Sequence, residues 1–115
     1  MATITFSQLF APNQVDNAAV ETLYTVPATP SNTILRNGRV RFANTTSGAV
    51  TIKGWAVPSA GSPTDSNVFL PTKSIPANDY IDVDVPVIAA GGMIQAQAGA
   101  ATSITATAID GFLQS

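Results

Sequence analysis

The residues of this chain best suited to chemistry are three aspartates in and beside the stretch DYIDVDV: Asp79, Asp82 and Asp84. Asp82 and Asp84 occupy alternate positions, so on an extended strand their carboxylates share one face about 7 Å apart. Such oxygens could ligate a hard cation such as Ca²⁺, or act as a carboxylate pair in glycoside hydrolysis.

The surroundings of these acids argue against both roles. No neighbouring segment supplies the further carboxylates of a calcium loop, and two acids on one strand do not flank a bond from opposite sides. The acids alternate with apolar residues from Tyr80 to Val85, which is typical of a half-buried strand with one wet face. We therefore predict a solvated strand face, whose charges also discourage unwanted edge pairing, and no metal or catalytic site.

Three of the five basic residues, Arg36, Arg39 and Arg41, form a second cluster. They could bind a phosphate or carboxylate bidentately, or form ion pairs between subunits. The favoured interpretation is a solvated strand face lying opposite Asp82 and Asp84 across a sheet. An interface is the alternative, because arginine is enriched there.

The only tryptophan, Trp55, could stack on a sugar, as could Tyr24 or Tyr80. A lone tryptophan in an alternating strand more often fills a core or anchors an interface. The sequence NTT at 44–46 matches a glycosylation sequon, but we interpret it as a turn. The residues predicted for an interface are Arg36, Arg39, Arg41, Trp55, Asp82 and Asp84.

Catalysis by a nucleophile is not expected, because the chain has no histidine and no cysteine. Its paired glycines, at 91 and 92, lack the strand–glycine–helix context of a phosphate loop. We predict that the protein is not an enzyme and that it uses no cofactor and no metal.

Composition limits the class of protein. At 115 residues the chain has the length of one domain, and 45% hydrophobic with only 10% charged residues is unlike a charged disordered chain. A net charge of −2 argues against a nucleic-acid partner. No apolar run approaches a membrane span and no signal peptide is recognisable, so we expect synthesis in the cytoplasm.

Val, Ile and Thr recur throughout, and eight prolines and eight glycines punctuate them. The spacing predicts an all-β fold: an antiparallel β-sandwich or jelly roll of about eight short strands. Residues 1–20 are expected to form an N-terminal strand or arm, and residues 21–115 the sandwich. The expected strands are 3–6, 21–26, 33–44, 49–57, 68–70, 80–85, 93–98 and 103–113.

Several local questions stay open or carry specific predictions. Residues 15–23 also fit a helix, and the NG at 37–38 fits either a hairpin turn or a bulge in one longer strand. Along the strand expected at 49–57, the large apolar residues switch from one strand face to the other, which predicts a β-bulge at Lys53–Gly54. Pro71 is expected to end its strand. The small residues of 93–108 suit either close packing between subunits or an inner face against larger residues.

Residues 21–114 resemble a family of small virion proteins of tailed bacteriophages. The resemblance lies in LYTVPA (23–28), VRFANTTSGAVTI (40–52), IPANDYI (75–81), and a glycine followed by MIQAQA (93–98), in this order and spacing. It implies a β-sandwich or jelly-roll module of a phage head, neck or tail, and it carries no catalytic residue.

The resemblance therefore implies a structural protein, most simply a capsid decoration or cement protein located in the virion. Its implied partners are copies of itself, as a dimer or trimer, and the major capsid protein or another virion protein. The alternative is a neck, tail or fibre module that binds a carbohydrate or another virion protein.

Overall fold

The computed structural model describes residues 3–6 and 8–115, and within them it is all-β. Ten strands follow one another along the chain: β1 (Ile4–Phe6), β2 (Asn13–Gln14), β3 (Glu21–Thr25), β4 (Ile34–Asn44), β5 (Val50–Val57), β6 (Val68–Ile75), β7 (Tyr80–Asp84), β8 (Ile88–Ala89), β9 (Met93–Ala98) and β10 (Ile104–Gln114).

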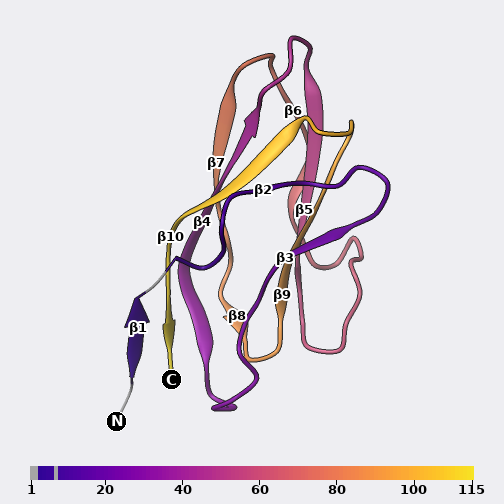
Figure 1. Cartoon of the computed structure of the whole chain (residues 1–115). Helices are drawn as coiled ribbons and strands as arrows, with labels where there is room; N and C mark the ends of the chain where they lie inside the picture. The colour runs from indigo at the N-terminus through magenta and orange to yellow at the C-terminus, as the bar shows by residue number, and fades with distance from the viewer. Residues whose placement is uncertain (1–2, 7) are drawn as a thin grey trace.

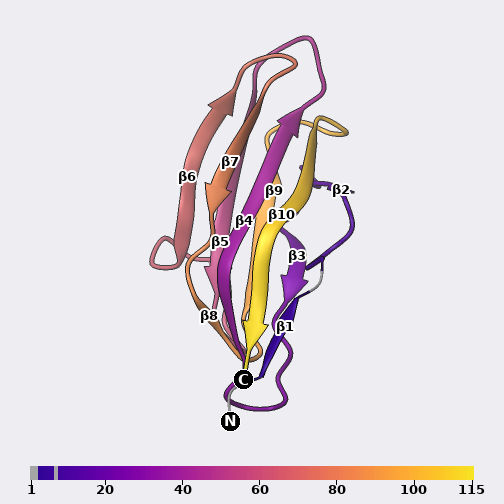
Figure 2. The same ribbon diagram turned by 90° about the vertical axis from the view of Figure 1, so that its left-hand side faces the viewer.

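The strands form two antiparallel sheets that lie face to face (Figures 1 and 2). In sheet A the order is β1-β10-β4-β7, with β2 also paired to β10 and β8 to β4; in sheet B it is β3-β9-β5-β6. The antiparallel pairs are thus β2–β10, β3–β9, β4–β7 and β5–β6. Each pair lies within the preceding one along the chain, as in one long hairpin that has been folded over. This is the strand order of a jelly roll, which confirms the predicted fold, with β1 and β8 as additions.

The core lies between the sheets and combines large and small side chains. Phe42 of β4 is fully buried and belongs to the same apolar cluster as Ala96 and Ala98 of β9. Along β9 every second residue is buried, so the MIQAQA stretch turns its small residues inward. For residues 93–98 the inner-face interpretation is therefore the correct one, because small side chains there leave room for a bulky opposite sheet.

A buried amide ties together two turns at one end of the sandwich. Asn44, only 2% exposed, donates from Nδ2 to the carbonyls of Gly48, Ile75 and Pro76, at 2.8, 3.0 and 3.2 Å. Its Oδ1 accepts from the backbone N–H and the hydroxyl of Thr46. The NTT sequence is a turn, as predicted. The side-chain nitrogen of the sequon, Nδ2 of Asn44, is buried and hydrogen-bonded within the protein.

The NG dipeptide lies within one long strand, β4, and not in a hairpin turn; three steps of β4, from Arg39 to Arg36, oppose two steps of β10, so the bulge alternative is the correct one. Asn37 has a positive φ of 54°, and β10 carries one extra residue between Ala108 and Asp110 where it pairs with β4. Nearby, Gly111 has φ 134°, and a Cβ there would lie 2.8 Å from Cδ1 of Leu9. The two strands therefore bend together at this point, where only glycine fits.

Two expectations for β5 and β6 were wrong in detail. The pairing of β5 with β9 runs without interruption, so the predicted bulge is not in β5; the extra residues lie in β6. Pro71 does not end its strand, because β6 continues to Ile75. As β6 is the outermost strand of sheet B, the missing N–H of Pro71 interrupts no ladder.

Residues 15–23, which also fitted a helix, form an irregular segment followed by β3. Their apolar positions serve the core: Val15 and Leu23 are buried. Within the described part of the chain, no helix has the length and apolar character needed to cross a membrane.

Candidate functional site

The predicted acidic and basic residues meet on the outer face of sheet A. Arg39 lies directly opposite Asp84, and Arg41 opposite Asp82, on the antiparallel pair β4–β7. Arg39 Nε donates to Asp84 at 2.9 Å, while Arg41 donates through Nε and Nη2 to the two oxygens of Asp82, at 2.8 and 3.1 Å. These four residues, the charge ladder, form the solvated strand face that the sequence indicated.

In the charge ladder, each aspartate is paired with the arginine opposite it. The hydrogen bond from Arg41 lowers the pKa of Asp82, and the same bond raises the pKa of Arg41. A carboxylate held ionised in this way is a weak proton acceptor and donates no proton at neutral pH. The arginine also lies over the ring of Tyr80, at 4.2 Å from its centroid. The charges therefore face one another and leave little for a ligand.

Asp79 does not join Asp82 and Asp84. It lies in the turn before β7, where its carboxylate accepts the backbone N–H of Tyr80 at 2.8 Å and its carbonyl accepts the N–H of Asn44. Across residues 3–6 and 8–115, no three acidic side chains are grouped as a metal ion would need. Asp79 therefore stabilises a turn, and Asp82 and Asp84 link β7 to β4.

Arg36 is separated from the other arginines by the bend in β4. It lies opposite Phe112 of β10, and its Nη1 donates to Oε1 of Gln114 at 3.3 Å. The basic cluster of the sequence is therefore two groups, one within the charge ladder and one at the far end of β4. The bulge at 37–38, one of the two alternatives that the sequence left open, separates the two groups.

Trp55 does not present a free ring. Its pairing with Gln95 places it on the outer face of sheet B, yet it is only 7% exposed. The ammonium of Lys53 lies 5.4 Å from its ring centroid and 3.8 Å from Asp65 in the following loop. Little of the ring remains accessible to a sugar.

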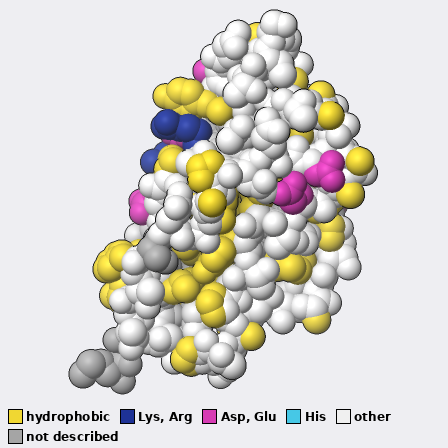
Figure 3. All heavy atoms as spheres, viewed as in Figure 1, with side chains coloured by type: hydrophobic (Ala, Val, Ile, Leu, Met, Phe, Trp, Pro, Cys, Tyr) yellow, Lys and Arg dark blue, Asp and Glu magenta, His cyan; other side chains and the backbone are white. Residues whose placement is uncertain are grey.

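An exposed apolar strip at the other end of sheet A was not predicted. Ile4 and Phe6 of β1 are 50% and 77% exposed, and the ring of Phe6 packs at 5.5 Å against Phe112 of β10. We call Ile4, Phe6 and Phe112 the β1 strip. In Figure 3, hydrophobic side chains gather over the region of β1 and β10, below the dark-blue basic side chains. On the strand expected at 3–6, alternation puts Ile4 and Phe6 on one face, but it does not show that this face is open to solvent.

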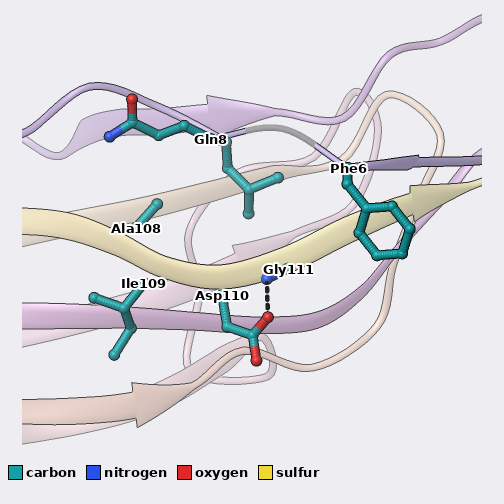
Figure 4. Close-up of a pocket in the computed structure, with 7 residues that line it drawn as sticks. Phe6, Gln8, Ala108, Ile109, Asp110 and Gly111 are labelled. Carbon is teal, nitrogen blue, oxygen red and sulfur yellow. Dashed lines mark hydrogen bonds between the residues drawn. The ribbon is translucent and has the colours of Figure 1, made fainter.

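A shallow cavity of about 340 Å³ adjoins the β1 strip, between Phe6 and the bulge of β10 (Figure 4). Its lining mixes apolar residues with Gln8 and Asp110, and the carboxylate of Asp110 accepts the N–H of Gly111 at 2.8 Å. A second cavity, of about 450 Å³, lies beyond Asp110 beside Arg39 and the exposed Val87. The charged groups that line the two cavities are already bonded, Asp110 to the backbone of Gly111 and Arg39 to Asp84.

Comparison with models of known protein families, with curated proteins and with solved structures finds no match to this chain.

Proposed function

We propose that this chain is a non-enzymatic structural protein of a tailed-phage virion, and most specifically a decoration or cement protein that stabilises the capsid. The observation that carries the proposal is the β1 strip: an aromatic side chain 77% exposed at a sheet edge, in a small domain whose charge ladder is paired within the molecule. Exposed apolar side chains gathered at one place mark a contact surface.

Two further features support the same function. The strand order is that of the jelly roll, an architecture found in viral capsid and lectin domains, although a fold alone does not fix a function. The resemblance of residues 21–114 to small virion proteins adds the phage context. A cement protein needs a packed core and a contact surface; the buried apolar cluster and the β1 strip are the parts that would serve these roles.

The test is co-sedimentation of the purified chain with empty shells and with tails of the phage whose genome encodes it. We expect it to sediment with the shells, and we expect shells lacking it to break at a lower temperature. Sedimentation with tails alone would move the protein to the neck or tail. A chain that binds neither particle and is absent from purified virions would contradict the proposal.

A carbohydrate-binding role is the second candidate, favoured by one observation. Tyr80 is 51% exposed and lies beside the polar side chains of Arg41 and Asp82, as in a sugar-stacking platform. Titration with cell-surface glycans should then shift the NMR signals of Tyr80. Signals that remain unchanged with every glycan would eliminate this alternative.

A further inference from the structure

The outer strands of the two sheets differ in how they are protected against pairing with another chain. β7 carries Asp82 and Asp84, and β3 begins with Glu21 and contains a bulge. β6 carries Pro71 and Lys73 and is doubly irregular. Charges, proline and bulges are the usual means by which proteins block sheet edges.

β1 has none of these protections. Its sequence is Ile-Thr-Phe, without charge or proline, and its pairing with β10 is regular. The sheet order ends at β1, so within the described residues no strand covers its outer edge. On the same side of sheet A, β2 contributes only Asn13 and Gln14. Among the outer strands of the described sandwich, β1 is thus the longest that carries no charge, no proline and no bulge; β2 and β8, which also lack them, have two residues each.

The alternation of hydrogen-bonded and non-hydrogen-bonded residues along β1 shows which of its backbone groups point away from β10. Thr3 and Ser115 exchange both hydrogen bonds, at 2.6 and 2.8 Å. In an antiparallel pair such residues alternate with non-hydrogen-bonded ones, so Thr5 bonds toward β10 while Ile4 and Phe6 direct their N–H and C=O groups outward. Unpaired groups in this arrangement form a template for an added strand.

We propose that this edge binds the β1 strand of a second copy of the chain, antiparallel about a two-fold axis at Thr5. Ile4 of each copy then faces Phe6 of the other, and the four outward groups of each strand form four hydrogen bonds in all. The edge is self-complementary, which is what a two-fold contact requires. Because two-fold pairing leaves the outer faces of both copies on one side, the two β1 strips merge into one apolar cluster.

This inference rests on the proposed function, since it supplies the self-association that a decoration protein uses. A pairing of two three-residue strands is smaller than a standard stable interface. We therefore expect a weak, concentration-dependent dimer in solution, strengthened where many copies are held on one particle.

Sedimentation velocity of the whole chain across a concentration series is the test. Ile4→Pro removes one outward N–H per copy and leaves the bonds of β1 to β10 in place, so we expect the dimer to weaken about tenfold. The matched control, Val87→Lys, replaces a similarly exposed aliphatic residue, 62% exposed, outside β1 and should change nothing. A wild-type chain that stays monomeric, or a dimer unaffected by Ile4→Pro, would overturn the inference.

A charge-exchange experiment tests the register. Ile4→Lys and Phe6→Glu should each weaken self-association, whereas an equimolar mixture should form a heterodimer, because the new lysine faces the new glutamate only in the antiparallel register. A mixture no tighter than either variant alone would contradict that register.

Particle binding separates this inference from the proposed function. If wild type and Ile4→Pro both sediment with shells but neither dimerises, the function stands and the edge pairing fails. If the wild type dimerises and binds no particle, the edge pairing stands and the function fails.

Discussion

The two outer strands of sheet A, β7 and β1, face solvent in opposite ways. β7 is lined by Asp82 and Asp84, each held by an arginine of the neighbouring strand. β1 exposes Ile4 and Phe6 and carries no charge. β7 pairs its side-chain charges within the molecule, whereas the outward backbone groups of β1 lie open to solvent. The two edges therefore differ in chemistry, and we propose that the paired charges protect β7 while the apolar edge at β1 makes contacts.

The largest effect is expected at the end of the sandwich where β7 begins. Asn44→Ala removes the buried amide that holds the two adjacent turns, so several buried carbonyls lose their donor. We expect a loss of about 3 kcal/mol in the free energy of unfolding, measured by urea denaturation. Self-association through β1 should persist where the variant is folded.

A matched control for this change is Asn67→Ala. Asn67 makes two comparable bonds, with Ser62 and Thr64, in the solvent-exposed loop before β6. Its loss should cost less than about 1 kcal/mol, because water replaces the bonds. Equal losses for the two variants would show that burial of the Asn44 amide is not what stabilises this end.

The next effect is expected at the bend that separates the charge ladder from the β1 strip. Gly111→Ala places a methyl group 2.8 Å from Leu9 Cδ1, at a φ of 134°. We expect about 1–3 kcal/mol of destabilisation in thermal or urea unfolding. Gly48→Ala is the control, since nothing lies within 4 Å of its added Cβ. A neutral Gly111→Ala would mean that the bend relaxes freely.

Removing the protection of β7 should make it behave more like β1. The double change Asp82→Thr and Asp84→Thr keeps strand-forming residues but removes both charges. We expect new concentration-dependent association, detected by light scattering, and more of it at high salt, where the freed arginines repel less. If the double variant associates no more than the wild type, the acids are not edge protection.

The smallest effect concerns pH. Arg41 lowers the pKa of Asp82 below its ordinary value of 3.8, so the pair contributes stability above that value and loses it as the pH falls through the lowered pKa. Asp82→Asn should therefore be slightly less stable than the wild type at neutral pH. The difference in free energy of unfolding should vanish at the acid end of a pH series. If the difference in free energy of unfolding stays the same at every pH, the effect of Asp82→Asn comes from packing and not from the charge of Asp82.

The sequence predicted the fold and the charge ladder because both follow from period-2 alternation and from cross-strand pairing of opposite charges. The same alternation holds in the structure, where Val40 and Phe42, which alternate with Arg39 and Arg41, are fully buried. What it missed depends on contacts between distant segments. The extra residues in β6, and the bend where Gly111 passes Leu9, leave no periodic signal of their own.

The β1 strip was missed for a different physical reason. Ile4 and Phe6 have the alternation of any half-buried strand, and burial of their face depends on whether another element covers it. The sequence pattern shows which residues of a strand share a face, but not which other element of the protein covers that face. The same limit applies to Trp55, whose outer position became visible only from its pairing with β9.

The most direct test of the contrast between the two edges is amide hydrogen exchange, read residue by residue by NMR in dilute and in concentrated solution. We predict that the amides of Ile4 and Phe6 exchange freely when dilute and become protected when concentrated. Protection of Thr5, and of the amides along β7, should stay the same. Rapid exchange at Ile4 and Phe6 in a concentrated sample, or new protection along β7 instead, would contradict the assignment of β1 as the contact edge.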